Sequence, residues 1–119
     1  MKTEIHNINN TKIAELISEK LLIKEIQDGI DLLVDVYYQD MDRIIIHEIN
    51  IIPAFFDLKT GMAGEILQKF SNYKMKLAIV GDLSKYNSKS LNDFIFESNK
   101  HGQINFVDSL EEALKKLAK

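Results

Sequence analysis

The stretch RIIIHEINII (Arg43 to Ile52) decides the fold class, because six of its ten residues are isoleucine. β-branched side chains favour an extended strand, and a nearly continuous apolar run indicates burial on both faces of a sheet. We therefore predict a central strand over these residues.

Towards the C-terminus, helical and strand patterns alternate. Gly61 to Tyr73 carries one apolar stripe at helical period, and Lys76 to Gly81 repeats the apolar strand character. We predict a further helix over Ser90 to Lys100, a strand over Ile104 to Val107 and a last helix over Ser109 to Leu117.

Capping residues support the last two helices. Ser90 with Asp93, and Ser109 with Glu112, have the spacing of capping boxes. Gly102 stands where a helix C-terminal cap is expected.

The N-terminal part predicts a hairpin followed by a helix. Lys2 to Ile8 and Thr11 to Ile17 are strand candidates, and Asn9-Asn10 between them suits a tight turn because asparagine tolerates positive φ. From Gln27 to Tyr38 the apolar spacing is helical. Ser18 to Ile26 fits either a short strand or an early helical turn.

Together these patterns predict an α/β fold. We expect a single domain over residues 1–119, with a mixed sheet in which the N-terminal hairpin forms an antiparallel edge and the parallel strands are joined by right-handed crossover helices. A chain of 119 residues is long enough for one such domain and too short for two.

Composition excludes several kinds of function. The net charge of -3 and the single arginine, Arg43, argue against nucleic-acid binding, because no basic surface or guanidinium clamp is available. The absence of cysteine excludes disulfides and thiolate metal sites. No apolar run is long enough for a membrane span, and the first ten residues lack a signal-peptide core, so we expect a cytoplasmic protein.

Polar residues follow the predicted parallel strands, and the carboxyl ends of such strands share one edge where ligands and partners usually bind. Asn50 to Gly61, Asp82 to Lys89 and Asp108-Ser109 should lie at this edge, with an exposed aromatic side chain at Phe55 or Phe56. The candidate binding residues are Asp57, Lys59, Thr60, Gly61, Asp82, Ser84, Lys85, Tyr86 and Ser88.

Two resemblances arise from these segments. The turn DLKTGMAGE (Asp57 to Glu65) after a strand, the strand LAIVG (Leu77 to Gly81) and the final EEAL (Glu111 to Leu114) resemble the anti-sigma-factor antagonist (STAS) domains. This implies a STAS-like architecture. FFDLKTGMAGEILQKFSNY, LAIVGD and SKSLNDFI also resemble the small bacterial family known as domain of unknown function 4180, which implies no activity.

Thr60 has two readings. As a helix N-cap, its oxygen would accept a hydrogen bond from a free backbone N–H, a contribution of about 1 kcal/mol. The STAS resemblance implies a second role, because there the hydroxyl residue before the turn glycine is phosphorylated by a partner kinase, and Thr60 precedes Gly61 here. Phosphate at this position would be stabilised by the helix N-terminus.

The histidines predict no metal site and no cofactor. His47 and Glu48 are adjacent on the predicted strand and should point to opposite faces. A lone histidine in such a strand is more often hydrogen-bonded than a ligand. His6 and His101 have no partner at ligand spacing.

Aromatic pairs suggest a contact surface. Tyr37-Tyr38 and Phe94-Ile95-Phe96 read most simply as core residues, but helical spacing forces one member of each group outward. Tyr38 and Phe96 are therefore candidates for the contact of a homodimer.

Three hypotheses for function follow. The leading one is a non-enzymatic regulatory module that binds a protein whose identity the sequence does not give, with Thr60 as a candidate switch. The second is a protein that binds a small apolar ligand or lipid between sheet and helices. The third is an enzyme using Asp57, His47 or Tyr86, and it ranks last because no nucleophile and base lie at a recognisable spacing.

Overall fold

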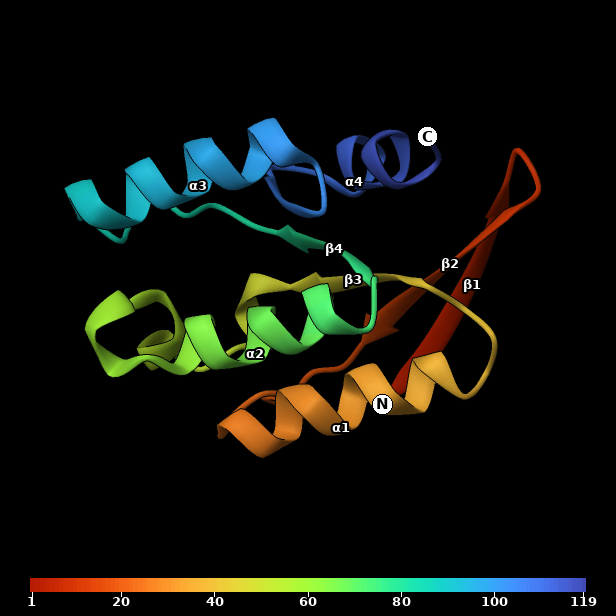
Figure 1. Cartoon of the computed structure of the whole chain (residues 1–119), viewed down its shortest axis with the longest axis horizontal. Helices are drawn as coiled ribbons and strands as arrows, with labels where there is room; N and C mark the ends of the chain where they lie inside the picture. The colour runs from red at the N-terminus through yellow and green to blue at the C-terminus, as the bar shows by residue number, and fades with distance from the viewer.

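The computed structural model describes residues 1–119 as one mixed sheet with four helices (Figure 1). The strands are β1 (Lys2–Ile8), β2 (Thr11–Ile17), β3 (Arg43–His47), β4 (Lys76–Val80) and β5 (Ile104–Val107). The helices are α1 (Ile26–Tyr37), α2 (Met62–Asn72), α3 (Lys89–His101) and α4 (Leu110–Leu117). Three short 3-10 turns, Glu48–Asn50, Pro53–Phe56 and Leu58–Thr60, connect β3 to α2.

The sheet order is β1-β2-β3-β4-β5, with only the β1–β2 pair antiparallel. Along the chain, β3, β4 and β5 each lie next to the preceding strand, so the sheet grows in one direction. Right-handed crossovers in one direction place their helices on a common face. The side chains of α1, α2 and α3 accordingly join one core cluster, while α4 packs on the opposite face against Ile45, Ala78 and Val107. The predicted hairpin and crossover architecture is confirmed.

Local chemistry sets several element ends. Asn9 and Asn10 adopt φ of 53° and 63°, which confirms the predicted tight turn. Gly102 ends α3 with φ of 79°, and the Ser109 hydroxyl accepts a hydrogen bond from the Glu112 N–H at the start of α4. Both caps lie where the sequence predicts them.

The central strand is shorter than predicted. β3 ends at His47, and Glu48–Asn50 turns, which leaves the Ile49 side chain 72% exposed. Asn50 explains the turn, because its side chain donates to the carbonyls of Ser18 and Lys20 and its own carbonyl accepts from the N–H of Ile23. An apolar run cannot reveal such a break.

The same contacts define the ambiguous segment before α1. Ser18 to Glu25 forms neither a helix nor a strand, apart from one bridge between Ile23 and Ile51. The carbonyl of Ile23 accepts a hydrogen bond from Ile52 N–H. The segment therefore bends repeatedly and joins the residues that follow β3 at Ile23.

Two further expectations are wrong. α3 begins at Lys89, because Ser88 and not Ser90 caps it by accepting from Leu91 N–H. Tyr37 is not a core residue but packs edge-on against Tyr38 and Tyr73 at the surface. Tyr38 and Phe96 do face outward, at 78% and 63% exposure.

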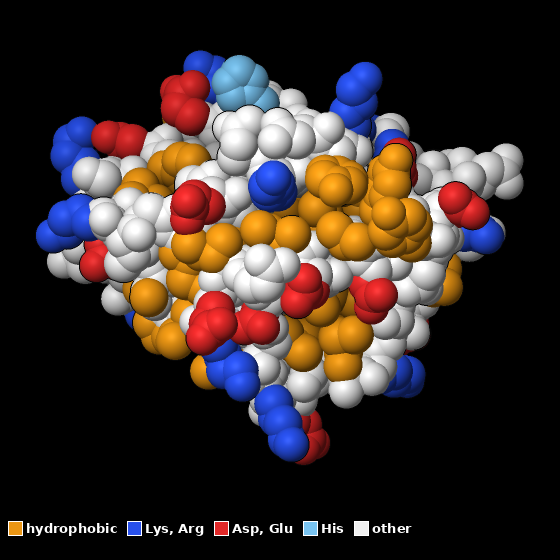
Figure 2. All heavy atoms as spheres, turned by 60° about the horizontal axis from the view of Figure 1, so that its bottom comes forward, with side chains coloured by type: hydrophobic (Ala, Val, Ile, Leu, Met, Phe, Trp, Pro, Cys, Tyr) orange, Lys and Arg blue, Asp and Glu red, His pale blue; other side chains and the backbone are white.

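Figure 2 turns the face of α1 and α2 towards the viewer, where hydrophobic patches lie between acidic and basic side chains. The exposed tyrosines at the C-terminal ends of these helices contribute to the apolar surface. None of the helices combines the length and the apolar character needed to cross a membrane.

Candidate functional site

The carboxyl ends of β3 and β4 lie towards the left of Figure 1, beside the N-termini of α2 and α3, and β5 runs parallel to β4. We call this region the carboxyl edge, comprising residues 48–61 and 81–89. It contains all nine residues predicted to bind a ligand or partner.

The centre of the carboxyl edge is a buried carboxylate. Glu48 is only 4% exposed, and its two oxygens accept from Lys85 Nζ at 2.8 Å and from Tyr86 Oη at 3.0 Å. We call these three residues the Glu48 cluster. A carboxylate removed from water needs such partners, because an unpaired buried charge is costly.

The Glu48 cluster changes the acidity of its phenol. Burial, the hydrogen bond to Glu48 and the negative charge of Glu48 raise the pKa of Tyr86 from 10.0 to about 12. Tyr86 is therefore a neutral hydrogen-bond donor at physiological pH, which makes the phenol a structural partner of Glu48 rather than a general base.

Close packing fixes the cluster between the two loops. A Cβ at Gly81 would lie 2.5 Å from the Glu48 Cβ, so glycine leaves the space that Glu48 occupies. The Tyr86 ring stacks on Phe56, with centroids 4.7 Å apart. The Glu48 cluster thus joins the loop after β4 to the loop before α2.

Thr60 closes the turn before α2. Its hydroxyl lies within donating distance of the carbonyls of Ala54 and Asp57, at 2.8 and 2.9 Å, and accepts from Met62 N–H at 3.2 Å. Gly61 adopts φ of 77° and occupies the N-cap position itself. Thr60 is therefore not the N-cap that the sequence predicts: it lies one residue before Gly61, and its hydroxyl accepts from the N–H of Met62, the first residue of α2.

The remaining predicted residues make local turns. The Asp57 carboxylate accepts from Lys59 N–H. Asp82 accepts from both the N–H and the hydroxyl of Ser84, and these hydrogen bonds hold the pKa of Asp82 below its usual 3.8. Asp57, Lys59, Asp82 and Ser84 are all exposed.

The structure corrects and extends the predicted site. Phe55 and Phe56 are both buried, because the 3-10 turn at Pro53–Phe56 folds them onto α2 and Tyr86. Glu48 and Ile49 belong to the carboxyl edge, but the sequence did not predict this, because both residues were assigned to a buried strand. The acidic residue within an isoleucine run could have indicated a polar site, because a buried carboxylate needs hydrogen-bond partners.

Two histidines also have a partner that spacing did not indicate. His6 and His47 place Nε2 2.8 and 2.6 Å from the two oxygens of Glu15, which is 4% exposed. Burial alone would raise the pKa of Glu15, but the hydrogen bonds from both imidazoles outweigh it and hold the pKa below its usual 4.5. His6 is thus not isolated, since β1, β2 and β3 bring the three residues together.

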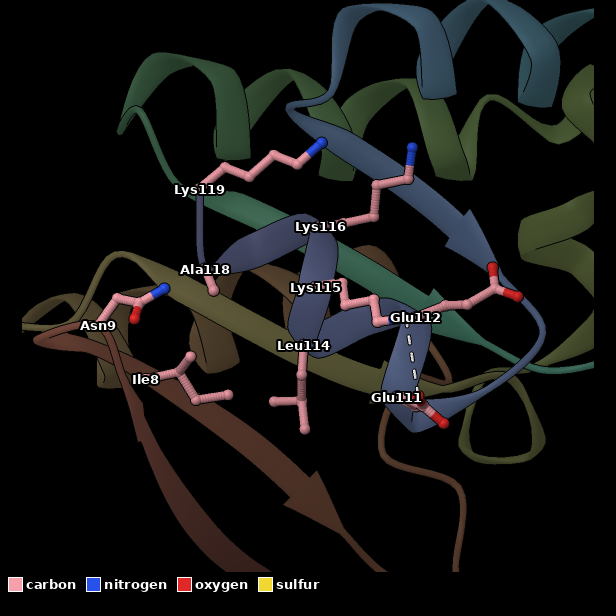
Figure 3. Close-up of a pocket in the computed structure, with 9 residues that line it drawn as sticks. All are labelled: Ile8, Asn9, Glu111, Glu112, Leu114, Lys115, Lys116, Ala118 and Lys119. Carbon is pink, nitrogen blue, oxygen red and sulfur yellow. Dashed lines mark ion pairs between the residues drawn. The ribbon is translucent and has the colours of Figure 1, made fainter.

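The largest groove lies away from the carboxyl edge, between the hairpin tip and α4 (Figure 3). Its volume is about 740 Å³. Ile8 and Leu114 supply apolar surface, while Glu111 and Lys115 form an ion pair along α4. Most of the isoleucine and phenylalanine side chains pack in or against the two core clusters instead. Binding of an apolar ligand between sheet and helices stays a prediction.

Comparison with known proteins defines the family and the fold. A family model described as "Domain of unknown function (DUF4180)" matches residues 8–117. No curated protein matches the chain. A crystal structure of a Thermotoga maritima protein, described as an anti-sigma factor antagonist, is similar over 98% of this chain and 95% of that one, with a TM-score of 0.51 and 14% identity. At 14% sequence identity, this similarity shows a shared fold alone.

Proposed function

The chain belongs to the DUF4180 family and has the fold of an anti-sigma factor antagonist, and from this premise we propose that it is a non-enzymatic regulatory module. It binds a partner protein through the carboxyl edge of its sheet. The structural neighbour is described as an antagonist of an anti-sigma factor, so the partner class we expect is a regulatory protein.

The observation that carries the proposal is the combination of rigid support and exposed contacts at the carboxyl edge. The Glu48 cluster and the Phe56–Tyr86 stack join the loop after β4 to the segment between β3 and α2. In the same loops, Ile49 is 72% exposed, and the charged residues Lys59 and Asp82 are also exposed. Protein interfaces combine apolar contacts at the centre with a polar rim, and the carboxyl edge offers exposed residues of both kinds.

Site-directed variants of the tagged protein, expressed at native level in its own cells, test the interface. Ile49→Ser and Lys59→Glu should each reduce recovery of a specific cross-linked partner at least about tenfold, as expected for central contacts. Ile5→Ser and Lys116→Glu are matched controls, because both side chains are exposed outside the carboxyl edge. If all four variants retain the partner equally, the binding surface is elsewhere and the proposal is wrong.

Within this function, Thr60 is the proposed switch. Thr60 is exposed, and a phosphate on its hydroxyl would lie next to the N-terminus of α2 and change the charge of the carboxyl edge. Because the Thr60 hydroxyl now closes the local turn, phosphorylation would also remove the single proton that it can donate to the carbonyl of Ala54 or Asp57. The modification would therefore reshape the partner surface as well as charge it.

Intact-mass and phosphopeptide measurements on protein from its own cells test the switch. A phosphate present in the wild type and lost in Thr60→Ala supports it. Unmodified Thr60 under all growth conditions would contradict the switch and leave the interface proposal standing. We also expect Tyr38 and Phe96 to form a homodimer contact, which sedimentation of the Tyr38→Ser and Phe96→Ser variants checks.

A further inference from the structure

A second polar cluster lies on the α4 face of the sheet and takes no part in the proposed function. Glu4, His6, Glu15 and His47 form it, and we call it the Glu15 cluster. The antiparallel register pairs Glu4 with Glu15 and His6 with Ile13. The parallel register pairs Glu15 with Ile45, two residues before His47. Because side chains alternate along a strand, all four point to the same face.

This part of the face has no helix over it. α4 packs over Ile45, Ala78, Val80 and Val107, and reaches the hairpin side only as far as Ile13. The side chains of His6 and His47 are 19% and 26% exposed, and Glu4 is exposed. The cluster is therefore in contact with solvent through Glu4 and the two imidazoles.

Glu15 is an unusual residue for its place in β2. Its neighbours Ile13, Ala14 and Leu16 are buried core residues, and burying a carboxylate among them is costly without compensation. Both imidazoles present Nε2 to it, one to each oxygen. An ionised carboxylate only accepts hydrogen bonds, so each Nε2 carries the proton when no cation is bound.

Three residues of the cluster, of which Glu4 is exposed and Glu15 is buried, have the donor set of a transition-metal site. One ligand atom each from Glu4, His6 and Glu15 lies within 4.8 Å of the others. Ligands at the usual zinc distances of about 2.0–2.2 Å stand roughly 3.4 Å apart around the ion. Rotation of the Glu4 and His6 side chains closes this difference, since strand register already fixes the backbone.

We propose that Glu4, His6 and Glu15 bind a divalent transition-metal ion of the zinc class, with His47 as a positioning residue. Glu15 Oε1 and His6 Nε2, now 2.8 Å apart, turn to the ion, the neutral His6 ring then carrying its proton on Nδ1, while His47 keeps donating to Glu15 Oε2. A hydrogen bond of this kind orients a ligating carboxylate. The imidazole favours zinc-class ions over Mg²⁺ and Ca²⁺, which prefer oxygen ligands alone.

Three protein ligands leave a fourth position for water. The two carboxylates give the site a formal charge that attracts a cation, and neither carboxylate is paired with a lysine or arginine in the structure. The inference does not depend on the partner-binding proposal, because the carboxyl edge supplies none of the three ligands.

Calorimetric titration of the chelator-treated full chain with ZnCl₂ tests the site, with CoCl₂ absorption as a second readout. We expect one ion per chain, and at least about tenfold weaker binding for Glu4→Gln and for His6→Gln. Glu4→Gln keeps the test sound even if His6→Gln unfolds, because Glu4 is exposed. His101→Gln is the control, since this histidine lies at the end of α3.

The role of His47 needs its own readout. His47→Ala should weaken binding by about 10- to 100-fold and change the cobalt spectrum, whereas His47→Gln, which keeps an N–H donor, should restore most of the affinity. MgCl₂ should produce no saturable binding. Zinc binding that Glu4→Gln and His6→Gln leave unchanged, or no zinc binding at all, would overturn the proposal.

Discussion

His47 and Glu48 are consecutive in the chain, yet their side chains serve two different polar clusters. His47 Nε2 lies 2.6 Å from Glu15 on the α4 face, and Glu48 accepts from Lys85 and Tyr86 at the carboxyl edge. The end of β3 is therefore the shared boundary of the proposed metal site and the proposed interface. A partner that moves Glu48 would also act on the residue that positions Glu15.

The Glu48 cluster predicts a specific alkaline titration. Tyr86 should ionise with a midpoint of about 12 in the folded protein, and Glu48→Gln should move that midpoint down towards 10, because the negative charge is removed while burial remains. Phenolate absorbance measures it. Subtracting the curve of Tyr86→Phe isolates this residue from the other three of the four tyrosines.

The sign of the linked stability follows. The folded pKa of Tyr86 is raised, so its contribution to stability is complete below pH 10 and is lost as pH rises from 10 through about 12. Circular dichroism must show that the chain is still folded across the titration. A midpoint near 10 in folded wild-type protein would contradict the proposed role of Glu48.

The contact between Gly81 and Glu48 predicts that Gly81→Ala destabilises the protein. The new Cβ would lie 2.5 Å from the Glu48 Cβ, and overpacking of this kind costs about 1–3 kcal/mol. Gly64→Ala is the matched control, because its Cβ meets no atom within 4 Å and replaces glycine inside α2, which should stabilise by about 0.5–1 kcal/mol. Chemical denaturation measures both. Equal effects would show that Glu48 is free to move aside.

Asn50 predicts the stability of the segment before α1. Its side-chain amide donates to the carbonyls of Ser18 and Lys20 at 2.8 Å each, and the residue is buried. Asn50→Ala should cost about 1–3 kcal/mol, because two carbonyls lose their donor. Asn72→Ala removes an exposed asparagine as the control and should change the free energy of unfolding by less than about 0.5 kcal/mol. Amide exchange should locate the loss at Leu22 and Ile23.

How far the sequence predicts the structure depends on the range of the interaction. The asparagine turn after β1, the Gly102 cap and the Ser109 cap are local, and all three could be predicted from neighbouring residues. The break after His47 could not, because it depends on Asn50 reaching carbonyls about thirty residues earlier. An isoleucine run has the same appearance whether it continues as a strand or turns.

The carboxyl edge and the Glu15 cluster also differ in how far the sequence predicts them. The loops of the carboxyl edge could be assigned from topology alone, since parallel strands end together. Glu15 with His6 and His47 required the register of three strands, which no spacing in one segment contains. The burial of Phe55 and Phe56 likewise follows from the turn at Pro53, whose packing is tertiary.

Thr60 gives the last prediction, which separates its structural role from its proposed modification. Thr60→Val keeps the shape but removes the hydroxyl that accepts from Met62 N–H and donates to the turn carbonyls, so it should destabilise by about 1 kcal/mol. Thr60→Ser keeps the hydroxyl and should stay within about 0.5 kcal/mol of the wild type. Thermal or chemical unfolding of the unmodified recombinant protein measures both, without any kinase present. If Thr60→Val is as stable as Thr60→Ser, the hydroxyl contributes nothing to the turn, and phosphorylation would act through charge alone.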